Sequence, residues 1–370
     1  MSRRQITELL ETSGYMPVET PILQPADIFL DLVGEDIRMR LFTTEDQAGD
    51  ELCLRPELTI PICRHHMQTG DAARPANYGY LAPAFRFRPD ESGEFIQAGI
   101  ESIGREDTLA ADAEVMALSA SLATAGGLSN PSITLGDSAI FMAFVEGLGF
   151  SPRAIRRLRR ALGSRARVEA ALEEVSRPAG DDDPAMLAAL SSAEPAEARA
   201  LVEDLMALAR IQPVGGRSSG EIAERFIEKA ARYAADPLPD AALTCLEALV
   251  HLEVPAREAS DLLKRLGQVA SLPMNPIIAQ YEARLDAFEE RNLAVDEMTF
   301  CGWSGGRLDY YTGFTFEMRN NGISGEDRTT PPAVSGGRFD GLMERLGADK
   351  TVPAVGAALW LDRLPKGDDQ

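Results

Sequence analysis

The sequence has few of the residues that build metal centres and disulfide frameworks. Its 370 residues include four cysteines and three histidines. The cysteines are Cys53, Cys63, Cys245 and Cys301, and the histidines are His65, His66 and His251. Neither set contains a C-x-x-C pair or shows the spacing of metal ligands. We therefore expect no metal site, no cofactor, and reduced, partly buried thiols in a cytoplasmic protein.

Long hydrophobic runs are also missing. No window approaches the roughly eighteen consecutive apolar residues that a membrane-spanning helix needs. The first residues, Met1–Ile6, contain two arginines with no apolar run behind them, which is not the pattern of a signal peptide. We expect no membrane partner.

Positive charge is scarce relative to negative charge. The chain has 58 acidic and 37 basic side chains, a formal net charge of −21. A protein whose main ligand is a polyanion usually carries a basic face. A local basic patch remains compatible with this balance, but the balance weighs against nucleic acid as the principal partner.

One segment departs from this balance, because residues 153–167 contain seven arginines. On a helix they would cover more than one face. They fit a solvated helix with acidic neighbours from Glu169, Glu173 and Glu174. A docking surface for an acidic partner and an RNA contact remain open alternatives.

The order of predicted elements indicates an α+β fold with an insertion. A hydrophobic fraction of 45% with 26% charged residues is ordinary for a soluble globular protein. Strand signals lie in 1–147 and 275–370, whereas 148–274 is rich in Ala, Leu, Arg and Glu and has helical periodicity. This pattern predicts an antiparallel core interrupted by a mostly helical domain, with loops at 178–184 and 212–219.

Local patterns in the first part predict individual elements. Residues 78–88 and 95–103 read as two strands joined by the turn-rich segment 89–93. Residues 110–125 read as a helix, and Arg38–Thr43 as a strand. Gly336 and Gly337 could form a tight turn or let backbone approach a ligand.

Several short motifs occur in a recognisable order. The sequence reads RPELT at 55–59, FR at 85–86, FIQAGIE at 95–101, LDYYTGFTFE at 308–317 and SGGRFDGL at 335–342. Together with the segment from Gly14 to Pro21, they resemble the class II motifs and the histidine-specific signature of histidyl-tRNA synthetases. The resemblance implies a class II aminoacyl-tRNA synthetase-like antiparallel sheet flanked by helices. It also implies a homodimer through the first motif, around Tyr15 to Phe29.

The resemblance assigns five residues to a pocket for L-histidine. Such a pocket needs acceptors for the ammonium group and a polar group at each ring nitrogen. By analogy with the family, Glu57, Thr59 and Gln97 hold the amine, and Glu101 and Tyr311 hold the imidazole. The alternative is that these residues form a buried network that binds nothing.

The parts that would activate histidine with ATP match less well. Adenylation needs cations to offset the repulsion between two anions. The synthetase arginine that precedes the L-D-Y-Y aspartate is replaced by Gly306, and Arg307 is one residue nearer, which in a strand faces the other side. The loop before Phe95 is shorter than in the family and brings in an acid, Glu94. Arg86 and Arg363 match the class-defining arginines; with Arg307, they are interpreted as anion-binding remnants.

This combination is similar to the regulatory subunit family of ATP phosphoribosyltransferase. Only 365–370 follow the last motif, so we expect no anticodon-binding domain. Members of that family assemble with a short-form catalytic subunit, typically as a hetero-octamer, and contribute to histidine feedback. The sequence thus predicts a non-catalytic regulatory subunit in the first step of histidine biosynthesis. The alternatives are a histidine-adenylating ligase acting on tRNA or another acceptor, and a scaffold without ligands.

Overall fold

The computed structural model describes residues 3–33, 35–89, 91–176, 199–200, 204, 240–306, 308–320 and 331–365. The loops expected at 178–184 and 212–219 lie outside the described residues, as does Arg307. In the described part of the chain, no helix is long and apolar enough to cross a membrane.

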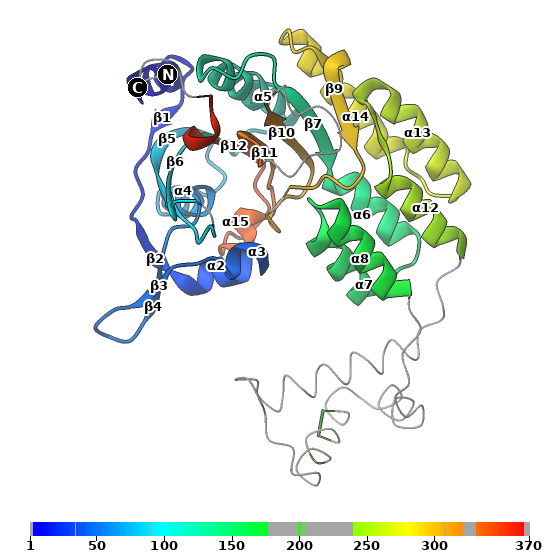
Figure 1. Ribbon diagram of the computed structural model, residues 1–370, viewed down its shortest axis with the longest axis horizontal. Helices are drawn as coiled ribbons and strands as arrows, with labels where there is room; N and C mark the ends of the chain where they lie inside the picture. The colour runs from blue at the N-terminus through cyan, green and yellow to red at the C-terminus, as the bar shows by residue number, and fades with distance from the viewer. Residues whose placement is uncertain are drawn as a thin grey trace.

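A nine-stranded sheet forms the centre of the described structure (Figure 1). Its strands, in spatial order, are β1 (Met16–Pro17), β5 (Ala76–Phe85), β6 (Glu94–Ile103), β12 (Ala354–Trp360), β11 (Val334–Arg338), β10 (Phe314–Arg319), β7 (Ser132–Asp137), β9 (Met298–Cys301) and β8 (Glu253–Pro255). The pairs β1–β5 and β7–β9 are parallel. The inner strands from β5 to β7 run antiparallel, as the sequence predicts. A small sheet consists of β2 (Leu23–Pro25), β4 (Glu51–Leu54) and β3 (Thr43–Glu45).

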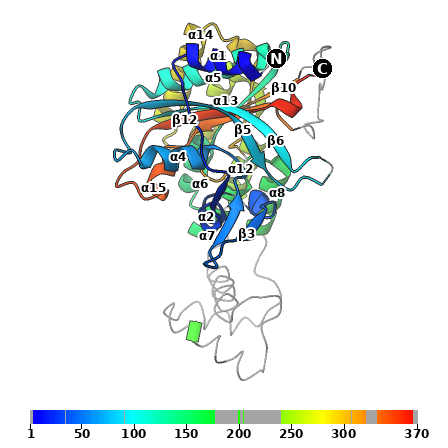
Figure 2. The same cartoon turned by 90° about the vertical axis from the view of Figure 1, so that its left-hand side faces the viewer.

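Helices cover both faces of the large sheet (Figure 2). One face packs against α1 (Arg3–Thr12), α5 (Thr108–Ala125) and α14 (Asn275–Glu290), and the other lies over α2 (Ala26–Leu32), α4 (Thr59–Met67) and α15 (Leu342–Arg345). The side chains of strand β10 are divided between the two faces of the sheet. Phe314 and Phe316 belong to the core beneath α5 and α14. The alternation of a strand then directs Thr315 and Glu317 to the opposite face.

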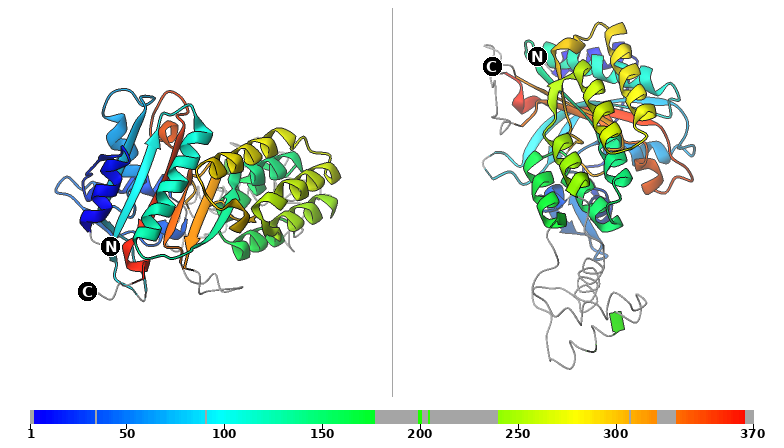
Figure 3. Two further views of the ribbon diagram at one scale, coloured as in Figure 1. Left: turned by 90° about the horizontal axis from the view of Figure 1, so that it is seen from above. Right: turned by 90° about the vertical axis from the view of Figure 1, so that its right-hand side faces the viewer.

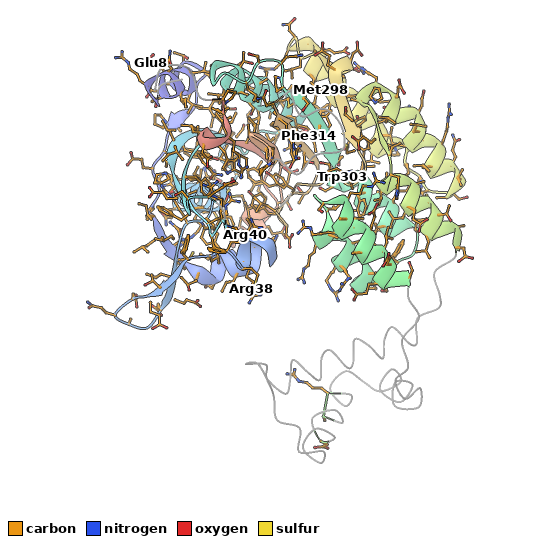
Figure 4. The ribbon with its side chains drawn as sticks, viewed as in Figure 1. Glu8, Arg38, Arg40, Met298, Trp303 and Phe314 are labelled. Carbon is orange, nitrogen blue, oxygen red and sulfur yellow. The ribbon has the colours of Figure 1, made fainter. Side chains whose placement is uncertain are left out.

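A helical part lies beside the β8–β9 edge of the sheet (Figures 1 and 3). It contains α6 (Ser138–Gly147), α7 (Pro152–Ala161), α8 (Arg165–Ser176), α12 (Asp240–Val250) and α13 (Ala256–Val269). Capping side chains begin two of these helices: Asp137 accepts hydrogen bonds from two backbone N–H groups of α6, and Ser151 accepts one from α7. Trp303 lies where the sheet meets these helices (Figure 4). The bounds 148–274 for an inserted domain stay a prediction.

Three local predictions are wrong or incomplete. Arg38–Thr43 is not a strand: α3 (Glu35–Arg38) ends there, because Ile37 is buried in the core on the α2 and α4 side, and β3 begins at Thr43. The stretch predicted to be mostly helical also contains the short edge strand β8, which pairs with β9. Gly336 and Gly337 form no turn; they lie within β11, which pairs on both sides.

Candidate functional site

The face of the sheet that looks toward α4 has a floor of small residues. Register places Gly99 beside Ala358, and Ala358 beside Ser335. In the next row, Glu101 lies beside Gly356. A Cβ atom on Gly356 would collide with the Glu101 carboxylate, so this close approach requires glycine. Small floor residues between larger flanking ones leave room for a ligand.

A cavity of about 220 Å³ opens above this floor. Of the residues that the sequence assigns to the histidine pocket, Glu57, Thr59, Gln97 and Tyr311 line it. They come from the start of α4, from β6 and from the segment before β10. The structure therefore brings four of the five together from three distant parts of the chain.

Glu57 caps the helix that carries Thr59. Its two carboxylate oxygens accept hydrogen bonds from the backbone N–H groups of Thr59, at 2.8 Å, and Ile60, at 2.9 Å. Burial raises the pKa of Glu57, while these hydrogen bonds oppose the rise. The Tyr310 hydroxyl donates a third, longer hydrogen bond of 3.5 Å to Glu57. A carboxylate has about four acceptor sites, so one remains for a ligand. Glu57 thus combines a structural role with a free acceptor in the cavity.

Glu101, the fifth predicted residue, lies one layer behind the cavity wall. Its Oε1 accepts a hydrogen bond from Thr59 Oγ1 at 2.7 Å, and its buried Oε2 has no hydrogen-bond partner within the described part of the chain. Burial raises the pKa of Glu101 well above its ordinary value. Thr59 and Gly356, which flank Glu101, both line the cavity. Glu101 is therefore separated from the cavity by Thr59 and Gly356.

The two tyrosines of the L-D-Y-Y motif stand together. The ring centroids of Tyr310 and Tyr311 lie 5.0 Å apart, and Tyr310 donates a long hydrogen bond of 3.5 Å to Glu57. Burial raises the pKa of both hydroxyls, so both are neutral donors at physiological pH. Tyr311 contributes its ring to the cavity wall.

Position 306 cannot accept an arginine in this conformation. The segment that holds Gly306 is irregular and follows the end of β9, so the alternation of a strand does not apply to it. Gly306 has a φ of +77°, and a Cβ atom on it would collide with the Tyr311 ring. The backbone at position 306, which the sequence resemblance aligns with the synthetase arginine, thus leaves no room for a side chain.

Arg86 and Arg363 both line the cavity, as a pair of cations around one aromatic ring. The Arg86 guanidinium lies 5.1 Å from the Phe95 ring centroid and 6.0 Å from that of Trp360, and Arg363 lies 4.6 Å from Trp360. Arg86 donates to the carbonyl of Pro56, and Arg363 to that of Pro332, both at 2.8 Å. Burial lowers the pKa of each guanidinium to about 10.

A third cation, Arg88, was not assigned to the site from the sequence. It lies 4.4 Å from the Phe95 ring centroid and lines the cavity. Asp362 holds it at 2.9 Å, and Glu91 forms a second ion pair with it. Glu94, expected near the reacting groups, is exposed beside the loop of the β5–β6 hairpin, opposite Phe85. The carboxylates that neutralise the cations are thus Glu91 and Asp362.

The second C-terminal motif holds the sheet to its helices. Arg338 and Arg284 both donate to Asp112 of α5, at 2.5 and 2.8 Å, and Arg338 also pairs with Asp340 at 2.9 Å. Asp112 is fully buried. Asp340 accepts a further hydrogen bond from the backbone of Ala354 at 2.8 Å. The SGGRFDGL motif therefore fixes β11 and β12, which form part of the cavity floor.

Two arginines of helix α7 form ion pairs on the surface. Arg157 forms an ion pair with Glu174, and Arg159 lies 3.6 Å from Glu146. In α8, Arg165 pairs with Glu169 at 2.9 Å. Two of the predicted acidic neighbours, Glu169 and Glu174, thus occupy the expected positions. Among the residues that the structure describes, no group of three or more His, Cys, Asp or Glu side chains could hold a metal ion.

Comparison with known families gives one consistent result. A family model described as Histidyl-tRNA synthetase matches residues 1–215 and 216–364. A protein of Chelativorans sp. (strain BNC1) named ATP phosphoribosyltransferase regulatory subunit is 38% identical over 367 residues, which cover 97% of this chain and 95% of that protein. A protein of the same name from Brucella anthropi is 37% identical over 350 residues, covering 94% and 92% of the two chains.

Solved structures resemble the whole chain. An ATP phosphoribosyltransferase regulatory subunit/histidyl-tRNA synthetase from Bacillus halodurans matches with a TM-score of 0.62 and 22% identity, over 99% of this chain and 79% of that one. A histidyl-tRNA synthetase from Nostoc matches with a TM-score of 0.61 and 18% identity, over 98% and 69%. These likenesses show the class II synthetase fold.

Proposed function

The chain belongs to the ATP phosphoribosyltransferase regulatory subunits, within the broader histidyl-tRNA synthetase family, and we propose that it activates a catalytic ATP phosphoribosyltransferase subunit and makes it sensitive to histidine. In this role it acts in the first step of histidine biosynthesis, as a subunit without catalysis of its own. Its effect on the partner depends on whether the cavity above the sheet holds L-histidine.

The observation that carries this proposal is a group of buried polar atoms without hydrogen-bond partners on the cavity face. Within the described residues they include Gln97 Oε1, Glu101 Oε2 and Tyr80 Oη. A buried polar atom without a partner costs about 1–3 kcal/mol, so several on one face are unfavourable unless a ligand satisfies them. A small polar molecule that accepts and donates hydrogen bonds would do so.

L-Histidine fits the chemistry of these groups. Its ammonium group can donate to Glu57, Thr59 and Gln97, while the imidazole nitrogens can bond Tyr311 and the Glu101 end of the cavity. Hydrogen bonds to charged groups are worth roughly 1.5–3 kcal/mol each. Two or three supply the approximately −5.5 to −8 kcal/mol of a sensor with an affinity between about 0.1 mM and 1 μM.

Three arginines that line the cavity and belong to the described residues are engaged within the protein, and position 306 offers no further cation. Gly306 replaces an arginine and has no space for one. Arg88 is neutralised by Glu91 and Asp362, and Arg86 and Arg363 are engaged with aromatic rings and backbone carbonyls. This arrangement supports a binding role over a histidine-adenylating ligase, which would have to concentrate positive charge on the ATP phosphates.

We propose two protein partners. The first is a second copy of this chain, which binds through the segment from Tyr15 to Phe29. Met16, Ile22 and Leu23 are large hydrophobic side chains about half exposed there, at 50%, 43% and 50%, and they suit an interface that uses one patch twice. The second partner is a short-form catalytic subunit, in a hetero-octamer.

Reconstitution with a short-form catalytic subunit tests the function. We expect phosphoribosyl transfer to rise on addition of the chain and to fall again on addition of histidine. Histidine-dependent exchange of pyrophosphate into ATP should stay at the level of a control without protein. Exchange well above that level, without activation of the partner, would favour the ligase.

A further inference from the structure

Tyr80 occupies a central position on the cavity face that no motif marks. It lies on β5 opposite Gly99 of β6. A Cβ atom on Gly99 would collide both with the Tyr80 hydroxyl and with the carbonyl oxygen of Ala357 on β12. The tyrosine side chain therefore lies across β6, and its hydroxyl occupies the space that glycine leaves between β5 and β12.

The Tyr80 hydroxyl differs from the other buried tyrosine hydroxyls that the structure describes. Tyr15 bonds Glu114, Tyr78 bonds His66, Tyr281 bonds a backbone carbonyl, and Tyr310 bonds Glu57. Tyr80 is 2% exposed, lines the cavity and has no hydrogen-bond partner among the described residues. Buried tyrosine hydroxyls usually find a partner within the protein, so this one is free for a ligand.

Tyr80 has two polar neighbours on the same face of the sheet, one in the cavity wall and one behind it. Gln97 and Glu101 lie two residues to either side of Gly99 and so on the same face of β6. Within the part of the chain that the structure describes, Gln97 Oε1 and Glu101 Oε2 are buried without hydrogen-bond partners, like the Tyr80 hydroxyl. Burial and then the charges of Glu101 and Glu57 raise the pKa of Tyr80. The hydroxyl therefore stays protonated and can donate one hydrogen bond and accept another.

We propose that the Tyr80 hydroxyl contacts an imidazole nitrogen of the bound amino acid and helps to select this ring. The inference rests on the proposed function, because it takes L-histidine as the ligand. The proposal adds a residue on β5 to the residues already proposed to bind histidine, which lie on β6, on and just before α4, and in the segment before β10. An apolar ring of similar size would leave the hydroxyl unpaired, and the pocket would discriminate against that ring.

Two isosteric variants of the whole chain test this assignment, Tyr80→Phe and its control Tyr78→Phe. Histidine affinity is measured by calorimetry, and the melting temperature of the ligand-free protein by thermal unfolding. Tyr80→Phe should weaken binding about five- to tenfold without lowering the melting temperature, because the lost hydroxyl had no partner. Tyr78→Phe should lower the melting temperature, because His66 loses a hydrogen bond of 2.9 Å, and should leave the affinity unchanged.

Methylated ligands then locate the contact. The wild-type chain should prefer histidine to 1-methylhistidine and to 3-methylhistidine. In one of these two isomers the methyl group covers the nitrogen that Tyr80 contacts, and for that isomer the preference should be smaller in Tyr80→Phe. Wild-type affinity in Tyr80→Phe, or a loss of affinity together with a lowered melting temperature, overturns the inference and leaves the proposed function intact. No histidine binding by the wild-type chain rejects both.

Discussion

Thr59 donates a hydrogen bond of 2.7 Å to Glu101, and this contact joins the start of α4 to the floor of the cavity. Thr59 lines the cavity, whereas Glu101 stands behind it with one oxygen unpartnered within the described residues. The pair couples the groups proposed for the amine to those proposed for the ring.

Glu101→Ala should weaken histidine binding by about ten- to a hundredfold, or roughly 1.5–3 kcal/mol. The substitution removes a polar group from the ring end of the cavity and the acceptor of the Thr59 hydroxyl. Calorimetric titration measures the change. Glu94→Ala is the matched control and should bind like the wild type, because Glu94 is an exposed carboxylate beside the loop of the hairpin. Unchanged affinity in Glu101→Ala would reject the site assignment.

Stability should fall with rising pH because of Glu101. Its folded-state pKa is raised well above the ordinary value by burial, so the folded chain retains a proton that the unfolded chain releases. The stabilising contribution is complete below about pH 4.5 and is lost as the pH rises toward the folded pKa, at up to about 1.4 kcal/mol per pH unit. Urea unfolding at pH 5 and pH 8 should show that Glu101→Gln gains stability relative to the wild type at the higher pH. A difference that stays constant between the two values would count against a protonated Glu101.

Gly306→Ala should destabilise the chain more than Gly149→Ala does. The two glycines have φ angles of +77° and +80°, so both variants carry the strain of a positive φ, about 1–2 kcal/mol. A Cβ at position 149 has nothing within 4 Å, whereas one at position 306 meets the Tyr311 ring. Urea unfolding should show a further loss of about 1–3 kcal/mol at position 306. Equal losses would mean that the ring moves aside freely.

The chain should be a homodimer in solution. Leu23→Glu places a charge in the proposed interface at a side chain that is 50% exposed, and so should shift light scattering toward the monomer without unfolding the chain. Val269→Glu, at a residue that is 82% exposed on α13, is the control. A wild-type monomer at tens of micromolar would contradict the dimer.

The sequence predicted the β5–β6 hairpin and the antiparallel core, and its local motifs supplied four residues that line one cavity. Glu57 and Thr59 are contiguous in one motif, and Gln97 and Glu101 in another. Tyr80 could not be found in this way, because its role depends on register with Gly99 and on the approach of β12. It could have been suspected from the alternation of the hairpin, which places Tyr80 on the Gln97 face.

Other features depend on distant contacts. Arg88 is neutralised by Asp362, 274 residues away along the chain, so its charge state could not be read from the hairpin. Arg38–Thr43 was mistaken for a strand because local preference did not reveal that Ile37 is buried in the core against the α2 and α4 side. The replacement at Gly306 was visible in the sequence, but its physical reason was not: the Tyr311 ring occupies the space of a side chain.

The most direct test of the account is a histidine titration of the reconstituted complex, with and without phosphoribosyl pyrophosphate. Feedback requires a coupling free energy, so histidine must bind the inhibited complex more tightly than the active one. A coupling of about 1–3 kcal/mol predicts that the substrate weakens histidine binding roughly 5- to 150-fold. It also predicts that a Glu57→Ala, Glu101→Ala double variant escapes inhibition. Identical histidine affinities in the two titrations, with inhibition persisting in the double variant, would contradict a feedback site in this cavity.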